Sequence, residues 1–194
     1  MSTPLAVIEA GVRERARDLP GDADSSDALL RRLIAEEIAA WQEDHRRGLR
    51  PAAIADPEWL AERAFRDLAR YGPLTELLED DDVWEVMVNG PDAVFVKRHR
   101  GPSGYHHETF LDDEHVVRTL TRLLEHSSTS HRKLDPAEGL QDAQLDDGAR
   151  LHIVHGDLSR GGHLMVNIRK FTGVAISSLD ELVSVGTLSR SGAA

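Results

Sequence analysis

The chain has 194 residues, no cysteine and a formal net charge of −11 at pH 7. The lack of cysteine excludes disulfides, thiolate metal sites and cysteine nucleophiles, and the acidic balance lacks the positive footprint that nucleic-acid binding requires, so we expect no nucleic-acid partner. A hydrophobic content of 40% suffices for a folded core, and because the sequence has neither a signal-peptide pattern nor an apolar run of membrane-spanning length, we expect a cytoplasmic protein.

The first 25 residues are expected to be flexible or weakly helical. They contain one short apolar patch, Leu5 to Ala10, and a linker rich in proline, glycine and aspartate from Pro20 onward. We therefore treat 1–25 as a flexible N-terminus ahead of a helical segment at 26–70.

The helical segment is predicted to hold two amphipathic helices. Apolar residues in 27–47 follow the spacing of one buried stripe, and Asp56-Pro57 is a typical N-cap followed by proline at the first helical position. We expect these helices to dock through their Trp41 and Trp59 faces, on the sheet or on a neighbouring chain.

The stretch Val83 to Lys97 is predicted to form a β-hairpin. Two runs rich in valine flank Asn89-Gly90-Pro91-Asp92, a group of residues that favours a tight turn. Alternation along the first run predicts that Trp84, Val86 and Val88 share one face.

The remainder of the 71–186 region is predicted to add strands and covering helices. A short helix precedes the hairpin at 73–79, and a helix at 111–126 starts with Asp112 as its cap and turns Val116, Val117, Leu120, Leu123 and Leu124 inward. Further strands are predicted at 105–110, 142–145, 149–154 and 163–171, and a last helix runs from 178 to Gly186. The fold class is therefore α+β, with a helical segment followed by an antiparallel sheet and covering helices.

Self-sufficient catalytic chemistry is not indicated. The sequence has no G-x-x-x-x-G-K-[ST] phosphate loop, no G-x-S-x-G and no H-E-x-x-H motif. The histidine pairs lie on predicted strands at spacings that point to opposite faces, so we predict no metal site. The acidic clusters lie at element boundaries, where aspartate caps helices or breaks elements. These groups are His106-His107, His152-x-x-His155, Asp80-Asp81-Asp82 and Asp112-Asp113-Glu114.

Three cations remain as candidate binding residues, namely Arg150, Arg169 and Lys170. If their two strands pair antiparallel, the start of one lies beside the end of the other. Two guanidinium groups there could bind phosphate oxygens in a bidentate manner. Surface ion pairs with Asp142, Asp146 or Asp147 are the alternative, and spacing alone favours it.

Several motifs, in a fixed order, resemble the N-terminal domain of the traffic ATPases of type II and type IV secretion, and most of all the tight-adherence (Flp) pilus assembly ATPases. The resemblance covers roughly 70–188. The matching segments are Tyr71-Gly72-Pro73-Leu74-Thr75-Glu76-Leu77-Leu78, Glu85-Val86-Met87-Val88-Asn89-Gly90-Pro91, Asp142-Ala143-x-Leu145-x-Asp147-Gly148-x-Arg150, Ile168-Arg169-Lys170-Phe171 and Leu179-Asp180-Glu181-Leu182-Val183.

The resemblance implies a PAS-like α+β domain that forms one tier of a hexameric ring. In such ATPases a RecA-like domain with the phosphate loop follows, ATP and Mg²⁺ lie in the cleft between the two domains, and arginines of the N-terminal domain reach the nucleotide. By motif those arginines are Arg150 and Arg169, and 187–194 is the start of the linker. Inner-membrane secretion or pilus proteins would be the partners, which implies a peripheral location at that membrane.

Two expectations follow for the chain by itself. It hydrolyses no ATP, and it holds no bound cofactor, because the phosphate loop is absent. Gln144 stands where the family usually carries arginine, so one phosphate-side cation is missing.

The alternative function is a non-catalytic PAS-like module that binds an inner-membrane secretion partner through the helices at 26–70.

Overall fold

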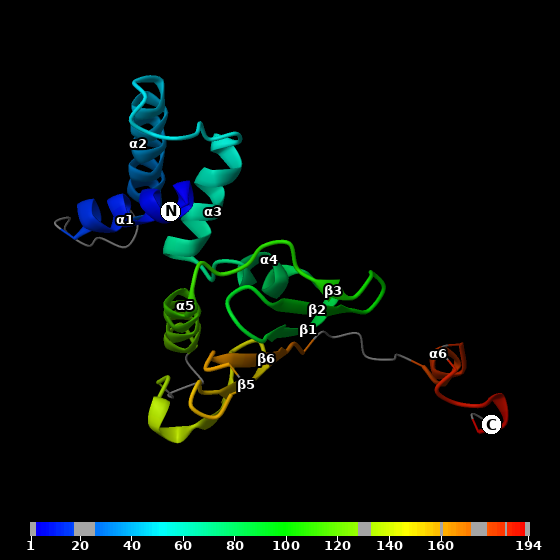
Figure 1. The fold of residues 1–194 in the computed structure, drawn as a ribbon. Helices are drawn as coiled ribbons and strands as arrows, with labels where there is room; N and C mark the ends of the chain where they lie inside the picture. Colours follow the sequence, from blue (N-terminus) through cyan, green and yellow to red (C-terminus); the bar gives the residue numbers. More distant parts are fainter. Residues whose placement is uncertain are drawn as a thin grey trace.

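The computed structural model describes residues 3–17, 26–127, 133–159, 161–171, 178–184 and 186–192. Within these residues the protein is α+β, as predicted from the sequence. A group of three helices and a six-stranded sheet with its own helices each enclose a separate hydrophobic core (Figure 1). No helix in the described ranges is both long enough and apolar enough to cross a membrane.

The three N-terminal helices are α1 (Pro4–Ala16), α2 (Ser26–Arg46) and α3 (Pro57–Ala69). Helix α1 corrects the expectation of a flexible N-terminus over 4–16, because Ile8 and Val12 are buried in the core that α2 and α3 share. The two side chains are one helical turn apart, so they fall on one face. The remainder of the expected flexible stretch, 18–25, lies outside the described residues.

The two tryptophans of the helical segment have different environments. Trp41 is buried at 5% exposure, and its Nε1 donates to the Ala52 carbonyl at 2.9 Å. Trp59 is 48% exposed, so α3 does not dock on the sheet through its Trp59 face, and docking of that face on a neighbouring chain stays a prediction. Leu60 and Ala64, one turn apart, face the core instead, and Trp59 precedes that stripe by about 100° around the helix.

The sheet is antiparallel throughout, in the order β3-β2-β1-β6-β5-β4. Helix α4 (Leu74–Glu79) leads into β1, and α5 (Asp113–Glu125) packs its apolar stripe in the same core as one face of the sheet. The strands are β1 (Val83–Val88), β2 (Val94–Arg98), β3 (Gly104–Tyr105), β4 (Leu140–Gln144), β5 (Arg150–Val154) and β6 (Met165–Arg169).

A β-bulge in β1 corrects the predicted face of the hairpin. The register shifts between Val83 and Glu85, so Val83 joins Val86 and Val88 in the core. Trp84 is only half-buried and lies against Lys97, whose Nζ is 5.1 Å from the indole centroid. An extra residue in one strand reverses the alternation on one side of the bulge.

The other predicted elements are present with changed limits. The strand expected at 105–110 is only the two-residue β3, which ends at Tyr105, and the following segment brings the Glu108 carboxylate to two arginines of α3. In α5, Asp112 is the N-cap as predicted, but Val117 is 37% exposed and lies beside the buried stripe. The last helix, α6, spans Leu179–Ser184, and a short 3₁₀ helix follows at Arg190–Gly192.

Candidate functional site

A row of polar side chains crosses the sheet at one end, on the face opposite the core. Residues paired directly across antiparallel strands share a face and have Cβ atoms about 5 Å apart. The neighbouring row, which contains Leu151, Ile168 and Val86, is buried in the core. The polar row, from β4 to β2, is Gln144, Arg150, Arg169, Glu85 and Lys97.

Glu85 is the buried centre of this row. Its side chain is 3% exposed and accepts hydrogen bonds from Lys97 Nζ at 2.6 Å, Asn167 Nδ2 at 3.1 Å and Arg169 Nη2 at 3.3 Å. Burial by itself would raise the pKa of Glu85, but these three hydrogen bonds outweigh it and hold the pKa below its usual value. Glu85 is therefore an ionised anchor at neutral pH, and it orients Arg169 on the open face.

The two candidate arginines lie side by side. Arg150 and Arg169 are direct cross-strand partners, and the Arg169 side chain is 66% exposed. Arg150 is also exposed, and within the described ranges it makes no side-chain hydrogen bond or ion pair. Within the described residues, neither arginine forms the predicted ion pair with Asp142, Asp146 or Asp147. Instead, Asp142 binds His152 and Arg169 binds Glu85.

Lys170 points away from the arginines, as alternation along a strand requires. Its Nζ donates to the carbonyls of Leu77 at 3.1 Å and Asp80 at 2.7 Å, at the C-terminal end of α4. Its own N–H donates to the Trp84 carbonyl at 2.9 Å. Burial lowers the pKa of Lys170, and the charge of Asp80 partly offsets this. The structure thus brings together two of the three candidate cations and uses the amine of the third to hold the end of a helix.

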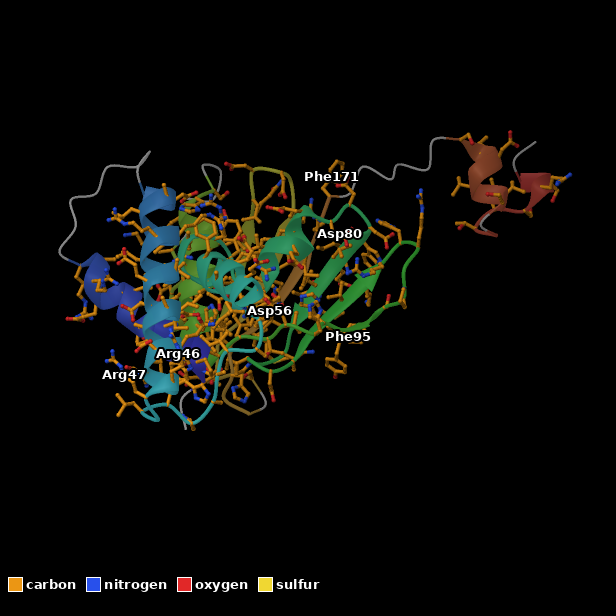
Figure 2. All side chains as sticks on the ribbon, turned by 90° about the horizontal axis from the view of Figure 1, so that it is seen from above. Arg46, Arg47, Asp56, Asp80, Phe95 and Phe171 are labelled. Atoms are coloured by element: carbon orange, nitrogen blue, oxygen red, sulfur yellow. The ribbon has the colours of Figure 1, made fainter. Side chains whose placement is uncertain are left out.

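A hollow of about 480 Å³ opens over the arginine pair. Gly148, in the turn before β5, has a φ of +86°, and a Cβ there would lie 3.4 Å from Phe171 Cβ. Phe171 is 78% exposed, and Figure 2 shows its side chain standing off the body beside the last strand. The hollow therefore combines two cations with one exposed aromatic ring. Its walls are Gln144, Gly148, Arg150, Arg169, Lys170 and Phe171.

Sequence reasoning missed Glu85 and did not single out Phe171 as part of the site. The only signal for Glu85 was an acidic residue inside an apolar strand, opposite Lys97 in the hairpin register. In the part of the chain that the structure describes, no three histidine or acidic side chains gather in a way that could hold a metal ion.

Comparisons with known proteins give partial matches. No family model matches the chain. The uncharacterized protein MJ0781 of Methanocaldococcus jannaschii is 30% identical over 136 residues, which is 70% of this chain and 18% of that protein. The crystal structure of the VirB11 ATPase of the Brucella suis type IV secretion system, in complex with sulphate, is 26% identical with a TM-score of 0.47, over 60% of this chain and 34% of that one. The chain thus spans about a fifth of its curated relative and a third of the solved structure.

Proposed function

We propose that this chain is the N-terminal domain of a secretion or pilus-assembly ATPase, and that Arg150 and Arg169 bind the phosphates of a nucleotide held by a RecA-like domain. The observation that carries the proposal is the arginine pair. The two residues are cross-strand neighbours at the rim of one hollow, and Arg150 has no carboxylate partner among the described residues. The ordered motifs that resemble this class of ATPase end on the same two positions.

The charges of the row suit an anionic ligand. Glu85 carries one negative charge, and Lys97 and Arg169 both bind it, so the row from Arg150 to Lys97 keeps a net positive charge. Guanidinium groups bind phosphate oxygens through two parallel N–H donors, and two arginines on cross-strand neighbours, whose Cβ atoms are about 5 Å apart, can engage neighbouring oxygens. A site of this kind adds cations to a phosphate that is held mainly elsewhere.

The chain has no phosphate loop, so in this proposal hydrolysis belongs to the parent enzyme. ATP and Mg²⁺ would be held chiefly by the RecA-like domain, whose backbone N–H groups and lysine supply most phosphate contacts. Assembly into a hexamer, and a peripheral location through inner-membrane secretion or pilus proteins, complete the proposal.

The test is titration of the ¹⁵N-labelled chain with ATP, with inorganic triphosphate and with adenosine. Both phosphate compounds should shift the amide signals at the start of β5 and the end of β6 with a dissociation constant near millimolar, whereas adenosine should not. Arg150→Ala and Arg169→Ala should abolish these shifts, and Arg47→Ala, in the turn directly after α2, should leave them unchanged. Absence of shifts in the wild-type chain, or robust ATP turnover by it, would contradict the proposal.

A further inference from the structure

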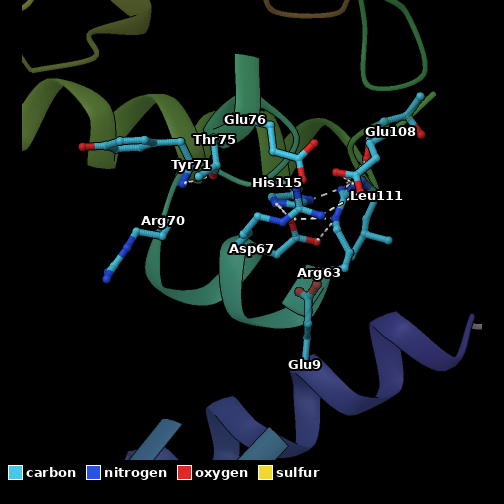
Figure 3. A network of polar contacts seen from close by, with 12 residues as sticks. Glu9, Arg63, Asp67, Arg70, Tyr71, Thr75, Glu76, Glu108, Leu111 and His115 are labelled. Atoms are coloured by element: carbon cyan, nitrogen blue, oxygen red, sulfur yellow. Dashed lines mark hydrogen bonds and ion pairs between the residues drawn. The ribbon is translucent and has the colours of Figure 1, made fainter. Parts of the chain in front are cut away.

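Two carboxyl groups are buried where α1 packs on α3. The side chains of Glu9 on α1 and Asp67 on α3 both have 0% exposed surface. Figure 3 shows Glu9 rising from α1 toward Asp67 and Arg63. Two carboxylates brought together out of water cannot both be ionised without a large cost in free energy, unless cations compensate both of them.

The cations near the pair compensate the two groups unequally. Arg63 Nε donates to both oxygens of Asp67 at 3.0 Å, so Asp67 is the ionised member. Glu9 Oε2 accepts from Arg13 Nη2 at 2.6 Å, but this guanidinium is 38% exposed and therefore weakly held. Glu9 Oε1 is fully buried, and it lacks a hydrogen-bond partner within the described ranges.

His115 of α5 does not supply the missing charge. Its Nδ1 accepts the N–H of Leu111 at 3.3 Å, which places the ring proton on Nε2, and Nε2 lies 3.6 Å from Asp67 Oδ1. Burial lowers the pKa of His115 to about 4, so the ring is neutral at physiological pH. The ring therefore directs an N–H dipole toward Asp67.

The other charged groups around the pair are already engaged. On α2, Glu36 and Glu37 bind Arg15, two turns along α1 from Glu9. The other arginines near the pair belong to α3 and α5. On α3, Arg63 and Arg66 both bind Glu108, and Arg66 also binds Glu76. On α5, Arg122 donates to the carbonyls of Asp67 and Arg70, and Arg118 binds Glu114.

We propose that one proton held between Glu9 and Asp67 latches α1 onto α3, and that loss of this proton releases α1. A protonated Glu9 donates its O–H toward Asp67, which gives the orphaned oxygen its partner. After deprotonation two carboxylates face each other without water, and their repulsion cancels the favourable free energy of docking α1 on α3. Release would uncover the apolar residues Ile8 and Val12 together with the surface of α2 and α3 that they cover. The latch does not depend on the function proposed above.

The direction of the pH effect follows from linkage. Burial first, and then the charge of Asp67, raise the pKa of Glu9 from 4.5 to about 8. A raised acid pKa in the docked state gives a contribution that is complete below 4.5 and is lost as the pH rises toward 8. The equilibrium constant for docking of α1 should therefore fall by at most about tenfold per pH unit in that interval. His115 has a lowered pKa and acts in the opposite direction below about 6.5, so measurements above pH 6.5 report on Glu9 alone.

Hydrogen exchange of the α1 amides tests the latch directly. After correction for intrinsic exchange rates, protection of 4–16 should fall by roughly 15-fold between pH 6.5 and 8, while that of α5 changes much less. Glu9→Gln is neutral and nearly isosteric, and it should remove the pH dependence. Glu14→Gln changes an exposed glutamate on the same helix and should keep it. Constant α1 protection in the wild type, or the same slope in Glu9→Gln, would overturn the proposal.

A second measurement needs no variant. The ¹³C signal of the Glu9 carboxyl, assigned through the backbone of the wild-type chain, should titrate with a midpoint near 8. Titration of that carboxyl below pH 6 would show that no proton is retained between Glu9 and Asp67, and would overturn the proposal even if Glu9→Gln failed to fold.

Discussion

Replacement of Glu108 by glutamine should destabilise the whole chain, because this residue joins the helical segment to the sheet domain. Its side chain is 3% exposed and binds Arg63 Nη1 at 2.9 Å and Arg66 Nη2 at 2.7 Å, both on α3. Those guanidiniums are themselves 3% and 6% exposed. Loss of the carboxylate charge leaves two buried cations with less compensation, whereas the amide oxygen still accepts one hydrogen bond.

The expected cost is at the lower end of what a broken buried ion pair costs, about 3 kcal/mol. For a chain of this size about 1 kcal/mol lowers the melting temperature by about 2–4 °C, so the shift should be about 6–12 °C. Thermal unfolding followed by far-ultraviolet circular dichroism measures it.

The matched control is Glu62→Gln on α3, the helix whose arginines Glu108 binds. Glu62 binds Arg31 in an exposed pair, with both side chains about half exposed, and such a pair contributes about 0–1 kcal/mol. The reasoning is refuted if Glu108→Gln melts within about 1 °C of the wild type, or if the exposed control is as costly as the buried change.

Three further outcomes are expected. In a protein that joins this chain to the proposed RecA-like domain, Arg150→Ala or Arg169→Ala should weaken nucleotide binding by roughly 10- to 150-fold, since a charge-assisted hydrogen bond contributes about 1.5–3 kcal/mol. Calorimetry measures this, Arg169→Lys should restore it only in part, and unchanged affinity would count against the site. Lys170→Met should cost about 1–3 kcal/mol in chemical denaturation, because two carbonyls at the end of α4 lose their donor; a smaller effect would mean that water replaces the amine. Gly148→Ala should lower the free energy of unfolding by about 1–2 kcal/mol, because Gly148 has a positive φ. Gly104→Ala, whose Cβ would meet open space, should be nearly neutral. Equal costs for the two variants would show that the positive φ of Gly148 does not explain the loss of stability.

The features that sequence predicted well are those fixed by near neighbours. Asp56 and Asp112 cap α3 and α5 as expected, since a cap needs only the next turn of helix. The hairpin and the α+β class followed from alternation and turn residues. Arg150 and Arg169 came out adjacent because the antiparallel pairing of their strands could be inferred from the turn between them.

The features that sequence missed depend on distant partners. Nothing local distinguishes Glu108 from a strand residue, yet it lies beyond the end of β3 and pairs with two arginines of α3. The bulge at Trp84 depends on how β1 meets β2. Glu9 lies within the short apolar patch Leu5 to Ala10, but its burial beside Asp67, 58 positions later, depends on how α1 packs on α3.

The antiparallel seam between β1 and β6 has a consequence for the order of assembly. The sheet consists of two three-stranded meanders, β1-β2-β3 and β6-β5-β4, and each can form from contacts close in sequence. Only the pairing of Glu85 with Arg169 and its neighbours joins them, across a loop of more than 80 residues, and closure of so long a loop is slow. We therefore expect the meanders to form first and the seam last. The arginine pair belongs wholly to the second meander, but its anchor belongs to the first, so the complete site exists only once the seam has closed.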